Sequence, residues 1–227
     1  MNSQPRVELV LFDLDGTLAD TAPDIAHALN VTLVEAGLPP HPIETVISYV
    51  GDGSAKLLER ALPSGQKDRQ VGPLLERFLL HYEARPCVES RLYPGIVELL
   101  KGLEGAGVKA AVLTNKTGKV ARRLVEALLP AATFVAVLGD GAGFPRKPDP
   151  TAARSLVERV GTTPQGTVVV GDGIPDVQTA QALGCRAIAA AWGYSPRARL
   201  QAQAPTWVAD LPEDVRKLLV PPGGFEG

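Results

Sequence analysis

The sequence predicts an α/β protein: a doubly wound parallel sheet with a Rossmann-like core and an all-helical insertion after the first strand. From residue 93 onward, short β-rich runs alternate with helical stretches, which is the pattern of a parallel sheet covered on both faces. Between residues 37 and 86 the apolar residues follow helical spacing, without a good strand candidate. The boundaries we expect are 1–18 and 90–220 for the core, 19–89 for the helical insertion and 221–227 for a loose C-terminal tail.

Local signals justify the elements of the N-terminal half. An apolar strand ends at Phe12. Asp20 or Thr21 can cap a helix that carries Pro23 in its first turn and stops at Gly37. Helical spacing then predicts three further helices, over residues 43–50, 54–62 and 66–84.

The C-terminal half predicts helices and strands in alternation. The helices are expected over residues 95–106, 117–129, 150–160 and 175–183. The strands are expected over residues 108–113, 134–138, 167–170 and 186–190, with a weaker one at 207–208. Together with the first strand, these runs give a sheet of five or six strands.

Composition narrows the classes of function. The 227 residues are 45% hydrophobic and 21% charged, which is typical of a globular protein with a sizeable core. A formal net charge of -2 provides no basic field for nucleic acid and argues against a membrane surface as partner. We expect no signal peptide, because the N-terminal apolar run stops at Phe12 and acidic residues follow it, and no apolar stretch approaches the roughly 18 residues of a membrane span. Cys87 and Cys185 lack metal-ligand spacing, so we expect free thiols and a cytoplasmic protein.

Two carboxylates, Asp13 and Asp15, directly follow the first strand. In an extended chain, side chains at i and i+2 leave the same face, so both carboxylates are expected to point into one small volume. Two like charges this close raise one pKa unless a cation lies between them. A turn alone would need only Asp15 and Gly16, and it would leave Asp13 unexplained. The sequence therefore predicts a metal site at the end of this strand.

Three further strand ends carry polar residues or lead into them. These residues are Thr114, Asn115 and Lys116 after the second strand, Lys147 in a proline-rich loop, and Asp172 and Asp176 after the strand at 167–170. Taken singly, each has a plainer interpretation as a helix cap or an exposed surface charge. Ligands of a doubly wound sheet bind outside the carboxyl ends of its strands, however. We therefore expect all four groups to meet in one pocket.

The charges indicate what this pocket holds. Four aspartates bring up to four negative charges and Lys147 returns one, so the pocket needs a hard cation. A cation held by few protein oxygens, with room for water and a phosphate, fits Mg²⁺ better than Ca²⁺. Lys147, the hydroxyl of Thr114 and backbone N–H groups near Gly16 and Asn115 are then free to face an anion. The combination is suited to binding a phosphoryl group.

The sequence resembles the haloacid dehalogenase-like phosphohydrolase superfamily, and closely its phosphoglycolate phosphatase group. The resemblance spans nearly the whole chain and rests on Asp13-Leu14-Asp15-Gly16-Thr17-Leu18, Leu113-Thr114-Asn115-Lys116, Lys147-Pro148-Asp149-Pro150, and Gly171-Asp172 with Asp176. The run Tyr49-Val50-Gly51-Asp52-Gly53-Ser54 resembles the cap loop of that group. Gly173 and Pro175 depart from the usual fourth motif, and we expect them to tune activity without abolishing it.

The resemblance implies a Mg²⁺-dependent phosphomonoester hydrolase that forms an aspartyl-phosphate, with 2-phosphoglycolate as the first substrate to consider. It implies that Asp13 is the nucleophile, that Asp15 is the general acid and base, and that Thr114 and Lys147 hold the phosphoryl oxygens. The implied metal ligands are Asp13, the backbone carbonyl of Asp15, Asp172 and Asp176. The expected substrate contacts are Gly16, Thr17, Asn115, Gly51, Gly53 and Ser54.

Several alternatives share these core motifs. A sugar-phosphate phosphatase, an inorganic pyrophosphatase and a phosphoglucomutase-like enzyme would differ only in the cap, which is expected to close over the site on hinges near 18–21 and 86–92. A dehalogenase is disfavoured because it has no use for Asp15 or a metal. A receiver-like phosphoaspartate module is disfavoured because it needs no lid. The expected partner is a small phosphorylated metabolite, and the chain could be a monomer or a homodimer.

Overall fold

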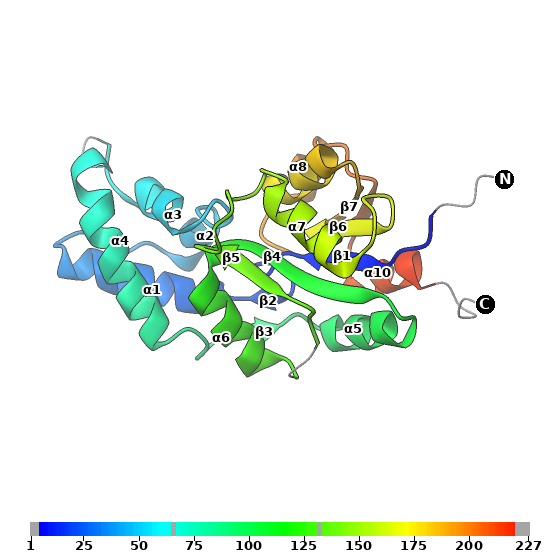
Figure 1. Ribbon diagram of the computed structural model, residues 1–227. Helices are drawn as coiled ribbons and strands as arrows, with labels where there is room; N and C mark the ends of the chain where they lie inside the picture. Colours follow the sequence, from blue (N-terminus) through cyan, green and yellow to red (C-terminus); the bar gives the residue numbers. More distant parts are fainter. Residues whose placement is uncertain (1–4, 65–66, 131–132, 221–227) are drawn as a thin grey trace.

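The computed structural model describes residues 5–64, 67–130 and 133–220, so the predicted tail and residue 66 lie outside the described residues. Within these residues the α/β prediction is confirmed: six parallel strands form one sheet in the order β5-β4-β1-β6-β7-β8 (Figure 1). The strands are β1 (Leu9–Phe12), β4 (Lys109–Thr117), β5 (Val137–Asp140), β6 (Thr167–Gly171), β7 (Arg186–Ala190) and β8 (Trp207–Ala209). The six-stranded form of the prediction is therefore the correct one.

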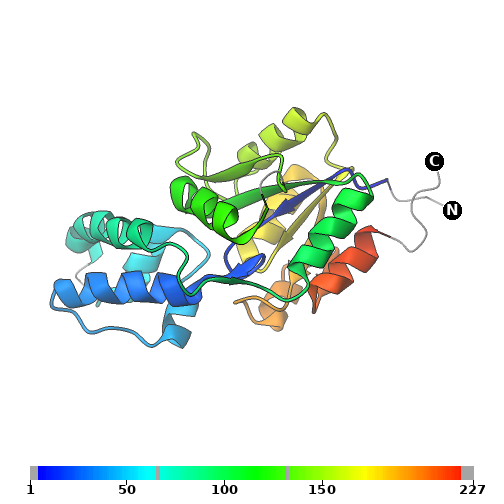
Figure 2. The same cartoon turned by 90° about the horizontal axis from the view of Figure 1, so that it is seen from below.

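Helices cover both faces of the sheet (Figure 2). One face packs against α5 (Ile96–Gly105), α6 (Gly118–Leu128) and α10 (Pro212–Leu219), and the other against α7 (Thr151–Val160), α8 (Ile174–Leu183) and α9 (Arg197–Gln201). Successive side chains of β1 point to opposite faces of the sheet. Val10 and Phe12 belong to the core on the face of α5, α6 and α10, and Leu9 and Leu11 belong to the core on the face of α7, α8 and α9. This alternation is why each strand reads as a continuous apolar run.

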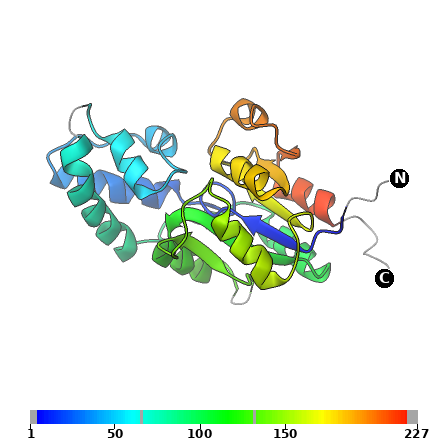
Figure 3. The ribbon, with the colours of Figure 1, turned by 45° about the horizontal axis from the view of Figure 1, so that its top comes forward.

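The insertion forms a helical cluster beside the carboxyl ends of the strands (Figure 3). Its helices are α1 (Ala22–Glu35), α2 (Ile43–Ile47), α3 (Ser54–Ala61) and α4 (Lys67–Ala84). Helix α4 packs on α1 and α3, and α1 packs on α2. The division of the chain into a core and a cap domain stays a prediction.

Two short strands, β2 (Ala19–Asp20) and β3 (Arg91–Leu92), pair antiparallel where the chain leaves the core and where it returns. Asp24, in the first turn of α1, adds a second link between these connections. Its buried carboxylate accepts hydrogen bonds from the backbone N–H groups of Val88 (3.0 Å), Glu89 (3.0 Å) and Ser90 (2.8 Å), and from the Ser90 hydroxyl (2.6 Å). The two predicted hinge segments are therefore fastened to each other.

Some predicted boundaries were wrong, and several short elements were missed. Strand β4 was expected to stop at residue 113, but it continues to Thr117 by pairing with β5, with an irregularity between Leu113 and Thr117. The helix predicted over 43–50 ends at Ile47, ahead of Gly51 and Gly53, whose positive φ angles of 119° and 87° no helix accommodates. The missed elements are β2, β3, α9 and α10. Among the described helices, none combines the length and apolar character that crossing a bilayer requires.

Candidate active site

The register of the sheet brings the predicted residues together. Phe12 at the end of β1 pairs with Val112 of β4 on one side and with Val170 of β6 on the other. All three strands run parallel, so Asp13, the Thr114 region and Asp172 emerge at the same edge. The strand ends thus lie along one edge of the sheet, and their residues are divided between two hollows that share Asp13 and Asp15.

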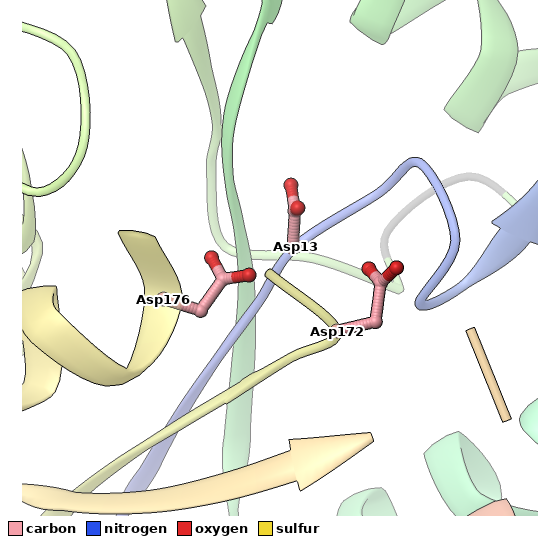
Figure 4. A group of neighbouring side chains, drawn as sticks. All are labelled: Asp13, Asp172 and Asp176. Carbon is pink, nitrogen blue, oxygen red and sulfur yellow. The ribbon is translucent and has the colours of Figure 1, made fainter. Parts of the chain in front are cut away.

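Three buried carboxylates form the centre of this edge: Asp13, Asp172 and Asp176 (Figure 4). Each offers an oxygen, and these oxygens all lie within 4.8 Å of one another. Burial, together with the charges of Asp13 and Asp176, raises the pKa of Asp172 to about 8. Burial also raises the pKa of Asp176, although the nearby Lys147 opposes that rise. Such a set of hard oxygen donors with uncompensated negative charge fits a divalent metal ion.

Lys147 lies between two of these carboxylates. Its ammonium nitrogen is 2.9 Å from Oδ1 of Asp13 and 2.6 Å from Oδ1 of Asp176. Burial alone would lower the lysine pKa, but the charges of Asp13 and Asp176 outweigh it and raise the pKa above its ordinary value. Lys147 therefore stays cationic at neutral pH and holds Asp13 and Asp176 in place.

Asn115 orients Lys147 and connects it to the insertion. Its Oδ1 accepts the backbone N–H of Lys147 at 2.8 Å, and its Nδ2 donates to the Lys147 carbonyl at 3.2 Å. The same Nδ2 also donates to the carbonyl of Gly51 at 3.1 Å. The Asn115 side chain is thus occupied by the protein itself, and it carries the Gly51 loop against the site.

The Asp15 carboxylate lies apart from the cluster of three. Its Oδ1 accepts hydrogen bonds from the Thr21 hydroxyl at 2.6 Å and from the Lys116 ammonium at 2.7 Å. Lys116 also lies 4.5 Å from the centre of the Tyr82 ring. Asp15 is therefore held by a hydroxyl and a cation, and its carboxylate is not part of the close group formed by Asp13, Asp172 and Asp176. The contact of its backbone carbonyl with a metal stays a prediction.

Asp172 is fixed by its neighbours. The Thr17 hydroxyl donates to Oδ1 at 2.8 Å and accepts the Asp172 N–H at 3.0 Å, while the Tyr194 N–H donates to Oδ2 at 2.7 Å. A Cβ at Gly16, whose φ is +79°, would lie 2.3 Å from Oδ2 of Asp172, so only glycine fits there. Thr17 is fully buried and its hydroxyl is engaged by Asp172, so it supports a metal ligand, and a substrate contact through this hydroxyl does not fit its placement.

A cavity of about 30 Å³ lies between the core and the insertion. The core contributes Asp13, Asp15, Thr114, Asn115 and Lys116 to its wall. The insertion contributes Ile25, Val50, Gly51, Gly53, Ser54, Leu57, Phe78 and Tyr82. The structure thus brings the predicted cap loop to the predicted catalytic carboxylates. A wider cleft of about 700 Å³, lined by Asp172, Asp176 and Lys147, adjoins it.

No role was predicted for Tyr194, which joins three parts of the site. Besides its N–H bond to Asp172, its hydroxyl accepts the backbone N–H groups of Thr21 (2.8 Å) and Ala22 (2.9 Å) and donates to Asp20 (2.9 Å). Thr21 was singled out only as a helix cap, and Lys116 only as part of a motif. The only sequence feature that pointed to Tyr194 is that a polar aromatic residue follows the strand predicted over 186–190, and this feature alone does not indicate a role in a site.

Comparison with known proteins identifies similar sequences over most of the chain. A model of the haloacid dehalogenase-like hydrolases matches residues 10–190. A phosphoglycolate phosphatase of Agrobacterium fabrum is 39% identical over 199 residues, covering 86% of this chain and 85% of the relative. A phosphoglycolate phosphatase of Aquifex aeolicus is 34% identical over 213 residues, covering 94% and 97%.

Solved structures agree with these relatives. The crystal structure of a predicted phosphoglycolate phosphatase from Haemophilus somnus has a TM-score of 0.86 at 29% identity, covering 95% of this chain and 99% of that chain. A second crystal structure, from Lactobacillus delbrueckii subsp. bulgaricus, has a TM-score of 0.90 at 28% identity, covering 96% and 100%. The family match extends over most of the sequence and includes Asp13 directly after β1, Thr114 in β4 and Asp172 directly after β6. This chain belongs to the haloacid dehalogenase-like hydrolases.

Proposed function

We propose that this protein is a Mg²⁺-dependent phosphatase that hydrolyses 2-phosphoglycolate to glycolate and phosphate through an aspartyl-phosphate. The observation that carries the proposal is the contrast between two neighbouring carboxylates. Asp13 lies among two other carboxylates and a lysine, and Asp15 lies in the same cavity bound to a hydroxyl and a different lysine. This contrast supports attack on phosphorus by Asp13 and proton transfer by Asp15.

Asp13 has one carboxylate oxygen available for attack. Oδ1 receives the Leu14 N–H at 2.8 Å and the Lys147 ammonium at 2.9 Å, whereas the described residues provide no hydrogen bond to Oδ2. In the first step Oδ2 forms a bond to phosphorus, the bond from phosphorus to the alkoxide breaks, and Asp15 gives its proton to the alkoxide. In the second step water attacks the phosphoryl group, Asp15 takes a proton from that water, and Asp13 is regenerated as phosphate leaves.

The metal site follows from the same residues. Asp13, Asp172 and Asp176, with the backbone carbonyl of Asp15, would hold Mg²⁺. When bound, the ion supplies positive charge that neutralises the phosphoryl oxygens. Lys147 and Thr114 hold the same oxygens from the protein. Because the Asp15 carboxylate is not needed as a ligand, it is free to carry a proton.

The helical insertion at 19–89 acts as a cap on the core formed by 1–18 and 90–220. Its loop at Gly51, Gly53 and Ser54 contributes to the wall of the cavity that contains Asp13. A closed cap excludes water from the reacting phosphoryl group and contacts the leaving group. The cytoplasmic location and the oligomeric state stay predictions.

The test is a panel of phosphorylated metabolites with purified protein and Mg²⁺. We expect the highest kcat/KM for 2-phosphoglycolate, lower values for hexose phosphates and pyrophosphate, and no conversion of β-glucose 1-phosphate to glucose 6-phosphate. Asp13→Asn, which preserves shape but removes the nucleophile, is expected to lose roughly 10³-fold or more in kcat. Absence of phosphate release from every substrate, or full activity of the Asn variant, would contradict the proposal.

A further inference from the structure

Lys116 places a buried cation in the substrate cavity, and the catalytic scheme leaves it without a substrate-directed role. Its side chain is 4% exposed and lines the cavity together with Asp13 and Asp15. The face of the Tyr82 ring lies beneath its ammonium at 4.5 Å, and Tyr82 is itself buried. The ring and the strand β4 fix the ammonium at the cavity wall.

The Lys116 ammonium has hydrogen-bonding capacity to spare. It carries three N–H donors, and among the described residues its one hydrogen bond goes to Oδ1 of Asp15 at 2.7 Å. The described residues that line the cavity include no other cationic side chain. The rest of the wall on the insertion side is largely apolar, with Ile25, Leu57 and Phe78. An anionic group entering this part of the cavity therefore has one cation to bind, Lys116.

The position of Lys116 relative to Asp15 identifies which part of the substrate it meets. Asp15 protonates the leaving oxygen in the proposed reaction, and the ammonium is hydrogen-bonded to Asp15. A group attached one carbon beyond the leaving oxygen therefore comes within reach of Lys116. In 2-phosphoglycolate that group is the carboxylate.

We propose that Lys116 is a specificity-determining residue that binds the carboxylate of the leaving group, so that the enzyme selects phosphorylated short hydroxy acids over neutral phosphomonoesters. The inference rests on the proposed phosphatase function and deepens it by naming the substrate class. A sugar hydroxyl would leave the cation with only Asp15 as a charged partner, whereas a carboxylate accepts its remaining donors. The second phosphate of pyrophosphate is also anionic, so it is included as a competing substrate in the test.

The experiment compares two esters that differ only in the charged group, 2-phosphoglycolate and 2-hydroxyethyl phosphate, with wild type and Lys116→Met. In wild type we expect kcat/KM for 2-phosphoglycolate to be higher by about 30-fold or more, which corresponds to loss of one partner of a buried ion pair. In Lys116→Met both substrates react more slowly because Asp15 loses its cation, and the preference falls to within about 3-fold. The ratio of the two substrates separates carboxylate binding from positioning of Asp15.

A control variant and the substrate preference of the wild type test the role of Lys116. Lys101→Met, at an exposed position on α5, is expected to keep the wild-type preference. Retained preference in Lys116→Met, or equal use of the two esters by wild type, would overturn the inference while leaving the phosphatase function intact; the wild-type comparison holds even if the variant fails to fold. A Lys116-dependent preference of wild type for pyrophosphate over 2-phosphoglycolate would overturn the carboxylate assignment. Absence of hydrolysis of every substrate would overturn the proposed function as well.

Discussion

Replacement of Asp24 by asparagine is expected to destabilise the fold, because Asp24 links the two connections between the core and the helical insertion. Its Oδ2 accepts the backbone N–H groups of Val88, Glu89 and Ser90 and the Ser90 hydroxyl, at 2.6 to 3.0 Å. The side chain is 4% exposed, so water does not readily replace these bonds. The four donors make Asp24 a buried carboxylate satisfied by neutral partners.

The magnitude follows from the hydrogen bonds. Asparagine can keep an oxygen in the Oδ2 position, so the substitution removes the charge and leaves the acceptor. Hydrogen bonds to a charged group are about twice as strong as neutral ones, with net contributions of roughly 1.5–3 kcal/mol against about 1 kcal/mol. Because four donors share one oxygen, the differences do not add, and we expect Asp24→Asn to lower the free energy of unfolding by about 2 kcal/mol.

The pH dependence supplies an independent check. Burial raises the pKa of Asp24, but the hydrogen bonds from Ser90, Glu89 and Val88 outweigh burial and bring the pKa below its ordinary value of 3.8. The stabilisation is therefore complete above pH 3.8 and is lost as the pH falls through the lower, folded-state pKa. The difference between wild type and Asp24→Asn should be largest at neutral pH and should shrink in acid.

Urea unfolding at pH 7 and at pH 3 measures both effects. Glu126→Gln on α6 is the matched control, since it removes a carboxylate from an exposed position and is expected to change the unfolding free energy by less than about 0.5 kcal/mol. A difference between wild type and Asp24→Asn no larger than that of the control, or one that grows as the pH falls, would refute the reasoning.

Three further predictions concern the site itself. Gly16→Ala puts a Cβ 2.3 Å from Oδ2 of Asp172 at a φ of +79°, so we expect a loss of about 1–3 kcal/mol in urea unfolding and weaker Mg²⁺ binding by calorimetry; unchanged values for both would contradict the placement. Thr21→Val removes the 2.6 Å hydrogen bond to Asp15, and kcat for 2-phosphoglycolate should fall roughly tenfold, whereas an unchanged kcat would mean that this bond does not orient the acid. Without metal, the pKa of Asp172 is raised from its ordinary value of 3.8 to about 8 in the folded protein. Between these two pH values the folded state holds a proton that the unfolded state has lost, so the contribution of Asp172 to stability falls as the pH rises. In EDTA, the melting temperature of the wild type should therefore fall more between pH 5 and pH 8 than that of Asp172→Asn does. Mg²⁺ should raise the melting temperature of the wild type more at pH 8 than at pH 5. An equal rise at both pH values would argue against a metal at Asp172.

The sheet could be predicted because its strands are short apolar runs buried on both faces. The strand β6, for example, is buried along its whole length, and its sequence carries that burial as consecutive valines. The paired strands β2 and β3 could not be predicted, since two residues each show no periodicity and their pairing joins segments about 70 positions apart. Helix α10 was missed although it begins with a proline and has Asp214 in its first turn, where the carboxylate accepts the backbone N–H of Leu211 at 3.0 Å.

Some residues of the candidate site could be predicted from the sequence and others could not. Asp13, Asp172 and Asp176 were predictable, because parallel strands place their carboxyl ends at one edge whatever the rest of the chain does. Lys116 pairs with Asp15 from the irregular part of β4, between Leu113 and Thr117. No local sequence pattern predicts that irregularity, so the pairing could not be predicted. Tyr194 depends on a loop that passes so close to the site that a Cβ at Gly193 would lie 2.3 Å from the carbonyl of Gly16.

The i and i+2 geometry that first drew attention to Asp13 and Asp15 explains only part of their arrangement. Both line one cavity, as predicted, but β1 ends at Phe12, and beyond it the carbonyl of Leu14 accepts the backbone N–H groups of a tight turn. The chain is no longer extended there, so the two carboxylates turn to different partners, Lys147 and the other carboxylates for Asp13, and Lys116 with Thr21 for Asp15. Two strictly parallel carboxylates would compete for one cation. The turn gives each aspartate its own environment, in keeping with the different roles that we propose for them: attack on phosphorus for Asp13 and proton transfer for Asp15.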